Sequence, residues 1–285
     1  MDFGEDTPRC SDAKGCALTV RVSVVTLSRN VATVIEPTIE SVHNQMYREL
    51  EHVIIDGQST DGTLKIIEAR RAKVARLIVR PPRGIADAFN AGVEASSGQL
   101  IIFLNAGDTF VGPDVIERVV LHYQENGWLW AYGGARFASP DGSSYIERPT
   151  AKFSYSHLVR TCFIAHPSAV THRDVFTRYG LFDTSYRSSM DYEFWLRVGA
   201  DCPGASLPFV ISTFALGGTS SDNRVRYAED RRARRSHLRM SGLRRAALEF
   251  WLGSQAYVIW FLKRSVPPSL QMILRQWRQT FGFPR

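Results

Sequence analysis

Residues 100–108 read Leu-Ile-Ile-Phe-Leu-Asn-Ala-Gly-Asp, and this stretch indicates the fold more strongly than any other. The five apolar residues are typical of a short strand buried on both faces of a parallel sheet. The Asn-Ala-Gly that follows predicts a turn that delivers Asp108 to the carboxyl end of the strand. Open α/β sheets bind ligands at that edge, so Asp108 is a candidate ligand-binding residue. The alternative is an Asp in an ordinary strand-to-helix turn.

Similar short apolar runs alternate with segments of helical pattern on the amino-terminal side of this stretch. The sequence predicts strands over 22–27, 53–56, 77–79 and 100–104, and helices over 33–45, 59–71, 84–95 and 113–123. This alternation predicts βαβ units with right-handed crossovers. The expected fold class is therefore α/β, with a doubly wound, mostly parallel sheet and helices on both faces.

The pattern loosens after residue 129. The sequence predicts strands over 130–137, 145–148, 165–170 and 209–214, a helix over 191–198, and a hairpin turn at Ser-Pro-Asp-Gly over 139–142. From residue 224 the chain is expected to be helical almost to its end.

Composition divides the chain into three parts. The 285 residues allow one large domain with appendages, and the apolar fraction of 44% excludes global disorder. The four cysteines are scattered, which favours a reducing compartment. The first twenty residues are polar and lack the apolar core of a secretory signal. We therefore expect a flexible leader over 1–20, a folded domain over 21–223 and a carboxyl-terminal extension over 224–285.

The extension is strongly basic. It holds 14 Lys and Arg against 3 Asp and Glu, a net charge of +11, whereas the rest of the chain is at −4. Residues 246–262 carry one charge and several aromatic side chains, and cations flank them. This pattern favours an interfacial membrane helix over 244–264, although a packed or oligomer-forming helix and a spanning helix are alternatives. The aromatic residues cluster with aliphatic ones, which argues against nucleic-acid binding.

Two further candidate sites follow strands or glycines in the amino-terminal half. Asp56 ends the second strand, where its carboxylate could accept the N–H of a pyrimidine base; turn formation and helix capping are the alternative. Asp87 and Asn90 share one face of a helix. They could contact a ribose or a sugar, or Asp87 could simply stabilise the first helical turn.

The remaining candidates lie in the carboxyl-terminal half. Asp191 opens an amphipathic helix and could project into a cleft as a general base, with an N-cap role as the alternative. His166 is a candidate acceptor-site residue, although a lone His is more often structural. The glycine-rich segment with Gly218 and Thr219 could close over a diphosphate or be a linker.

The order of these pieces resembles the family 2 glycosyltransferases with the GT-A fold, over roughly residues 21–218. The resemblance rests on 22–26, Asp-Gly-Gln-Ser-Thr-Asp-Gly-Thr at 56–63, 84–92, 103–108 and Asp-Tyr-Glu-Phe-Trp-Leu-Arg at 191–197. The Gly-Ile-x-Asp-Ala-x-Asn and Phe-Leu-Asn-Ala-Gly-Asp forms look like bacterial transferases of cell-surface polysaccharide and glycolipid assembly.

The resemblance implies roles for the matched positions. Thr26 and Asp56 would hold the nucleotide base, and Asp108 would bind a divalent cation, Mg²⁺ or Mn²⁺, that bridges the donor diphosphate. Asn105 and Gly107 stand where acids are usual and are expected to contact the donor. Asp191 would be the general base.

The resemblance also implies an activity. We expect an inverting transfer of a sugar from a nucleotide-diphosphate donor, with a UDP-sugar as the expected donor, to a hydroxyl of a cell-envelope saccharide or a lipid-linked acceptor. The expected location is cytoplasmic, peripheral on the inner face of the cell membrane, and an oligomer is possible. The alternatives are a non-catalytic nucleotide-sugar binding module and a nucleotidyltransferase, although the first strand lacks a following glycine-rich loop.

Overall fold

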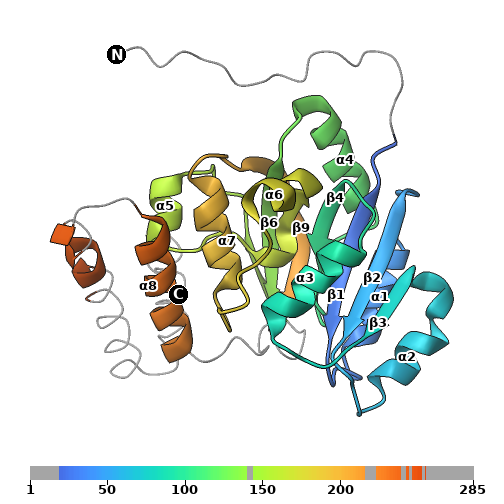
Figure 1. Ribbon diagram of the computed structural model, residues 1–285. Helices are drawn as coiled ribbons and strands as arrows, with labels where there is room; N and C mark the ends of the chain where they lie inside the picture. The colour runs from blue at the N-terminus through green and yellow to red at the C-terminus, as the bar shows by residue number, and fades with distance from the viewer. Residues whose placement is uncertain are drawn as a thin grey trace.

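The computed structural model describes residues 19–139, 144–215, 223–238, 242–243, 246–251 and 254 (Figure 1). Its strands are β1 (Val22–Ser28), β2 (Leu50–Asp56), β3 (Arg76–Val79), β4 (Leu100–Phe103), β5 (Thr109–Phe110), β6 (Trp130–Ala138), β7 (Tyr145–Arg148), β8 (Ala169–His172) and β9 (Ala205–Ala215). Its α-helices are α1 (Ile35–His43), α2 (Thr63–Ala69), α3 (Ile85–Ala95), α4 (Val115–Asn126), α5 (Tyr155–Arg160), α6 (Arg173–Tyr179), α7 (Met190–Gly199) and α8 (Asn223–His237).

One half of the sheet is parallel and is built from the apolar runs. β1 pairs with β2 on one side and with β4 on the other, and β3 extends the sheet beyond β2. The chain moves outward from β1 to β3 and then returns through α3 to β4, on the opposite side of β1. Because the strand order reverses at β1, a crevice opens beyond the carboxyl ends of β1 and β4. All four predicted strands are confirmed.

The other half is mostly antiparallel. β4 pairs antiparallel with β8, which pairs antiparallel with β6. β9 runs parallel to β6, and the short β5 closes the far edge. β6 and β7 form the predicted hairpin, whose turn over 140–143 lies outside the described residues. The result is a mixed sheet of the predicted α/β class.

Side chains of successive residues in β4 enter two separate cores. Ile101 and Phe103 pack with residues of α3, α6 and α7, whereas Leu100 and Ile102 pack with residues of α4. Figure 1 shows these helices around the sheet. Burial on both faces explains why the strand sequences are continuously apolar.

Some elements differ from the prediction because they are short or because a proline precedes them. α5 and α6 have six and seven residues, too few for the helical period to be read from sequence, and β5 has only two. The strand expected over 165–170 begins only at Ala169, because His166–Ser168 form a 3₁₀ turn. Pro167 has no N–H to donate to a sheet ladder, which accounts for this correction.

The helix α8 lies at the start of the basic extension and packs against α7 (Figure 1). The division of the chain at residues 223 and 224 stays a prediction. Most of the segment 244–264 and all of 1–18 fall outside the described residues. None of the helices in the described ranges is long and apolar enough to cross a membrane.

Candidate active site

A cavity of about 1380 Å³ lies where the carboxyl ends of β1 and β4 meet α3, the start of α7 and α8. Residues from all five elements or the turns next to them contribute to its wall. The predicted site residues in that wall are Asp87, Asn105, Gly107, Asp108, His166 and Asp191. The structure therefore brings together positions that span more than a hundred residues of sequence.

Asp108 is held by a turn that is fixed from a neighbouring helix. The N–H of Asp108 donates to the carbonyl of Asn105 (2.9 Å), and Gly107 has a φ of 98°, which favours glycine. Thr38 on α1 accepts the N–H of Gly107 and donates its hydroxyl to the carbonyl of Asp108, both at 2.9 Å. Asp108 is 4% exposed. These hydrogen bonds fix the turn, and Asp108 contributes to the cavity wall.

Asn105 and Asp108 are suited to hold a divalent cation. The side-chain oxygen of Asn105 is buried and has no hydrogen-bond partner among the described residues, although Asn105 lines the same cavity as Asp108. Carboxylate and amide oxygens are ligands for Mg²⁺, which commonly keeps water and substrate phosphates as its other ligands. No group of three or more His, Cys, Asp or Glu side chains that could hold a metal occurs in the described part of the chain. The residues fit a cation that the protein binds through few oxygens.

Asp191 stands in the first turn of α7, on the cavity wall. The helix begins here because its apolar side chains, among them Phe194, Trp195 and Val198, are buried in the core. One carboxylate oxygen of Asp191 accepts the N–H of Tyr192 at 2.8 Å. A carboxylate in this place is suited to act as a general base, which must lie within hydrogen-bond reach of the proton that it removes.

Asp230 is a second carboxyl group near Asp191 that the sequence did not reveal. It lies on α8 and lines the cavity. Burial raises the pKa of Asp230 to about 6, and the charge of Asp191 acts in the same direction. A hydrogen bond with Ser189 and the charges of Arg234 and Arg226 lower the pKa but do not outweigh burial. The only sequence signal was the spacing of four that places 226, 230 and 234 on one helical face.

Asp87 lines the cavity and has a cationic partner. Its carboxylate lies 2.9 Å from the guanidinium of Arg80, which also lines the cavity. Asp87 belongs to the first turn of α3. The pair places a guanidinium at the cavity wall, so Asp87 is able to orient Arg80 as well as to contact a ligand.

Asp56 and Thr26, the residues expected to hold the base, do not contribute to the cavity wall. Asp56 is fully buried and accepts hydrogen bonds from the hydroxyl of Ser28 (2.7 Å) and from the N–H (2.8 Å) and hydroxyl (2.7 Å) of Ser59. The hydroxyl of Thr26 donates to the carbonyl of Leu104 at 2.7 Å. Their side chains brace the strand ends behind the wall, and direct contact with a base stays a prediction.

Asn90 also lies behind the wall. Its side-chain amide donates to the carbonyl of Phe182 and accepts the N–H of Phe182, both at 2.9 Å. This two-way contact ties α3 to the loop that leads to α7. The structure therefore shows a bracing contact for Asn90, and contact with the donor stays a prediction.

His166 meets the cavity from within an aromatic cluster. Its ring stacks on Phe103, with 5.1 Å between centroids, and lies beside Phe89 and Phe182. Neither ring nitrogen has a hydrogen-bond partner among the described residues, and burial lowers the pKa of His166 to about 4. His166 is therefore neutral at pH 7. Gly218 and Thr219 lie outside the described residues.

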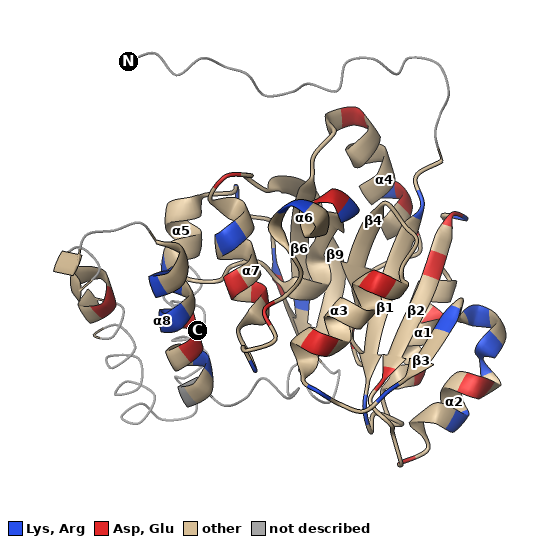
Figure 2. Cartoon of the chain, viewed as in Figure 1, with Lys and Arg blue, Asp and Glu red and all other residues tan. Residues whose placement is uncertain are grey.

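Arginines from three parts of the chain line the cavity. They come from the ends of β1 and β3, from α5 and from α8, where sequence reasoning had predicted only a basic extension (Figure 2). The cavity-lining arginines are Arg29, Arg80, Arg83, Arg160, Arg226, Arg231, Arg234 and Arg235. Guanidinium groups bind phosphate oxygens well, so the cavity suits an anionic ligand. Two of them, Arg231 and Arg234, pair with Glu249.

The fold and the site place the chain in a class of ligand-binding α/β proteins. The features of this class that the chain shows are a cavity where the strand order reverses, carboxyl groups on separate elements and an arginine-rich wall. The model of glycosyl transferase family 2 matches residues 23–184, more than half of the chain. The chain belongs to this family. The family assignment made from the sequence is thereby confirmed.

Curated relatives carry the same assignment. An uncharacterized glycosyltransferase of Mycobacterium tuberculosis (strain ATCC 25618 / H37Rv) is 29% identical over 204 residues, which cover 70% of this chain and 77% of that protein. A PGL/p-HBAD biosynthesis glycosyltransferase of Mycobacterium bovis (strain BCG / Pasteur 1173P2) is 28% identical over 179 residues, which cover 61% of this chain and 68% of that protein.

Solved structures show the same fold. Staphylococcus aureus TarS 1–349 in complex with UDP-GlcNAc superposes with a TM-score of 0.65 and 16% identity, covering 80% of this chain and 70% of that one. The mannosyltransferase PcManGT from Pyrobaculum calidifontis, in complex with GDP-Man and Mn²⁺, superposes with a TM-score of 0.56 and 18% identity. The match covers 91% of this chain and 80% of that one. The predicted GT-A fold is confirmed.

Proposed function

We propose that this chain is an inverting glycosyltransferase that moves a sugar from a nucleoside-diphosphate donor, a UDP-sugar by preference, to a hydroxyl of a saccharide or glycolipid acceptor. One observation carries the proposal. Asp108, on the turn after β4, and Asp191, at the start of α7, line a single cavity whose wall is rich in arginine. An inverting transferase needs acidic groups on different parts of one site, because the leaving diphosphate and the attacking hydroxyl lie on opposite sides of the anomeric carbon.

Asp191 is the proposed general base. Its carboxylate takes the proton of the acceptor hydroxyl as that oxygen bonds to the anomeric carbon, and the bond from this carbon to the diphosphate oxygen breaks. The nucleoside diphosphate leaves with the bonding electrons, and the arginines stabilise its charge. A positioned base of this kind contributes about 10²–10⁴-fold to the rate.

Asn105 and Asp108 would hold a divalent cation. Bound there, Mg²⁺ or Mn²⁺ would neutralise charge that develops on the leaving diphosphate. Asp108 is the acid predicted for this role, and the buried side-chain oxygen of Asn105, which has no hydrogen-bond partner in the described part of the chain, supports a second protein ligand. The solved mannosyltransferase with GDP-Man and Mn²⁺ gives independent support for a cation in this fold.

The proposed donor and acceptor classes draw on the relatives. TarS 1–349 was solved with UDP-GlcNAc and with UDP, which supports a uridine nucleotide. The name of the M. bovis relative, a PGL/p-HBAD biosynthesis glycosyltransferase, supports an acceptor of the cell envelope. A cytoplasmic site on the inner membrane face would give the enzyme access to such an acceptor.

A ligand panel followed by one variant tests the proposal. We expect UDP, GDP, UDP-GlcNAc or GDP-mannose, with Mg²⁺ or Mn²⁺, to raise the melting temperature, because a ligand that binds only the native state stabilises it. The donor that binds should be hydrolysed slowly to the nucleoside diphosphate and free sugar. Omitting the cation should weaken both effects.

Asp191→Asn should keep nucleotide affinity within about twofold and lose donor turnover by about 10²–10⁴-fold. Wild-type turnover by Asp191→Asn would show that Asp191 is not the base. Nucleotide binding with no donor turnover by the unmodified chain would favour a binding module. Release of pyrophosphate from a nucleoside triphosphate would favour a nucleotidyltransferase.

A further inference from the structure

Glu229 on α8 binds three consecutive backbone N–H groups in the loop before α7. One carboxylate oxygen accepts the N–H of Arg187 at 2.7 Å, and the other accepts those of Ser188 and Ser189 at 2.8 and 2.9 Å. Glu229 is 9% exposed. Hydrogen bonds from N–H groups to a buried carboxylate are stronger than those between neutral groups.

These three donors lead directly into the helix that carries Asp191. Ser189 is the N-cap of α7, and its own side chain does not cap the helix. Asp191 follows two residues later. An acceptor from another helix thus fixes the backbone at a point where helices usually rely on a local capping side chain.

We propose that Glu229 is a positioning residue for the transfer reaction, because it holds residues 187–189 and thereby sets the place of Asp191 in the cavity. The proposal rests on the proposed role of Asp191 as the base. It makes α8 a part of the catalytic unit, although α8 lies beyond residues 23–184, which the family model matches.

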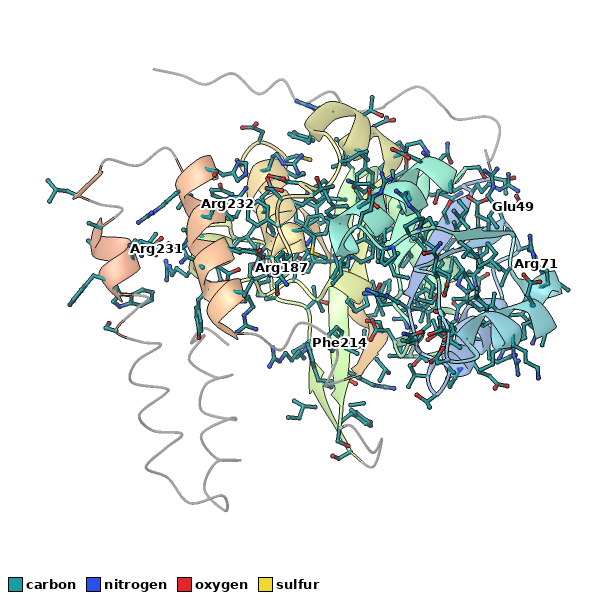
Figure 3. The ribbon with its side chains drawn as sticks, turned by 60° about the horizontal axis from the view of Figure 1, so that its bottom comes forward. Glu49, Arg71, Arg187, Phe214, Arg231 and Arg232 are labelled. Carbon is teal, nitrogen blue, oxygen red and sulfur yellow. The ribbon has the colours of Figure 1, made fainter. Side chains whose placement is uncertain are left out.

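Other contacts hold α8 along the same segment. The guanidinium carbon of Arg232 lies 4.3 Å from the ring centroid of Tyr186, and His237 Nε2 lies 2.7 Å from the carboxylate of Glu193 on α7. Figure 3 shows Arg187 close to α8, with Arg232 on that helix. Residues 187–189, which Glu229 binds, lie between Tyr186 and Glu193, so the loss of Glu229 would release the middle of an otherwise anchored segment.

The hydrogen bonds of Glu229 reach only the loop before α7, and Glu229 itself does not contribute to the cavity wall. Asp108 and its turn are held by Thr38 on the opposite side of the sheet from α8, independently of Glu229. The contacts of Arg232 and His237 also keep α8 and its cavity-lining arginines in place, so a displaced base slows the chemical step without weakening nucleotide binding. A displacement of about 1 Å in an active site can cost about 10²-fold in rate.

The test is Glu229→Gln in the full chain, which keeps the side-chain volume but removes one acceptor oxygen. We expect kcat for donor hydrolysis to fall at least tenfold, while the affinity for UDP or GDP and the KM for the donor stay within about twofold. Glu229→Asp, which keeps the carboxylate on a shorter stem, should recover part of kcat.

Glu51→Gln is the matched control. Glu51 is 7% exposed and likewise accepts backbone N–H groups, from Ser97 and Gly98, along with the hydroxyl of Ser23. It lies at the opposite end of β1 and β2 from the cavity. This variant should lower the melting temperature and leave kcat of the folded protein unchanged.

Three outcomes distinguish a wrong role for Glu229 from a wrong proposed function. Wild-type kcat in Glu229→Gln, when Asp191→Asn is inactive, overturns the role of Glu229 and leaves the proposed function standing. Wild-type turnover in Asp191→Asn overturns the proposed function instead. If Glu229→Gln does not fold, hydrogen exchange on the unmodified protein decides: the amides of 187–189 should be protected, and exchange at the rate of an open loop refutes the contact.

Discussion

Asp230 bears a charge at neutral pH in a site where burial favours its protonated form. The pKa of Asp230 is about 6 in the folded chain and 3.8 in the absence of the fold. Below pH 3.8 both states are protonated and the group has no effect on stability. As pH rises from 3.8 to 6, the unfolded chain loses the proton first, so the free energy of unfolding falls. Above pH 6 the decrease in the free energy of unfolding stays constant, at most about 3 kcal/mol.

Asp230→Asn should therefore stabilise the protein at pH 7.5, because the amide keeps a hydrogen-bond acceptor for Ser189 and removes the buried charge. We expect a higher melting temperature than that of the unmodified chain at pH 7.5 and a difference that shrinks as pH falls toward 4. Thermal melts at four or five pH values measure this. A difference that grows toward pH 4 would contradict the sign of the shift.

For single acidic residues, the sequence predicted the place in the fold better than the contacts of the side chain. Asp108 and Asp191 were predicted from their places at a strand end and a helix start, and both line the cavity. Asp56 was predicted on the same grounds, but its hydrogen bonds to Ser28 and Ser59 place it behind the wall. The end of a strand fixes where a residue lies, whereas local side-chain partners decide which way its polar atoms point.

At the scale of elements, α3 and β1 touch through a glycine. An added Cβ at Gly92 would overlap the side chain of Val25, so the helix can approach the strand this closely only without a side chain there. The same helix carries Ile85, Asp87 and Ala88 on the cavity wall. The close approach of α3 to β1 therefore helps to place these three residues on the cavity wall.

Gly92→Ala should destabilise the protein by about 1–3 kcal/mol through overpacking, even though alanine is the better helix former. For a domain of this size we expect a fall in melting temperature of about 2–4 °C per kcal/mol. Gly242→Ala is the control, because an added Cβ at Gly242 meets nothing within 4 Å. Equal melting temperatures for the two variants would mean that the contact is not tight.

Helices and strands also differ in how reliably the sequence predicts them. The continuous apolar run of β4 and the buried face of α7 were read correctly because many residues repeat one signal. The short helices α5 and α6 were missed because their packing, not their period, stabilises them.

At the scale of the whole molecule, the basic extension is the part of the chain that we propose contacts a membrane. Leu243, Phe250 and Trp251 are 88%, 80% and 44% exposed, and arginines of α8 lie nearby on the cavity wall. Exposed apolar side chains next to cations are typical of a surface that binds anionic lipid. This arrangement supports the proposed interfacial role of 244–264.

Deleting residues 244–285 should move the protein from the membrane fraction to the soluble fraction of a cell lysate. Deleting residues 1–18 is the control and should leave the distribution unchanged. Circular dichroism of both truncated proteins must show a folded chain. Equal membrane partitioning of the full chain and the 244–285 deletion would refute a membrane role for the extension.

The sequence by itself determined the class of the fold and the family, and it singled out Asp108 and Asp191, which are among the acidic residues that line the cavity, because buried strands and polar turns carry local signals. Only the tertiary structure decided which partners each polar group meets. It placed Thr26 and Asn90 in bracing contacts, gave Asp87 an arginine partner, and brought Glu229 and Asp230 of α8 to the start of α7. These contacts join residues about 7 to 92 positions apart, and nothing in the local sequence encodes a contact that depends on how helices pack.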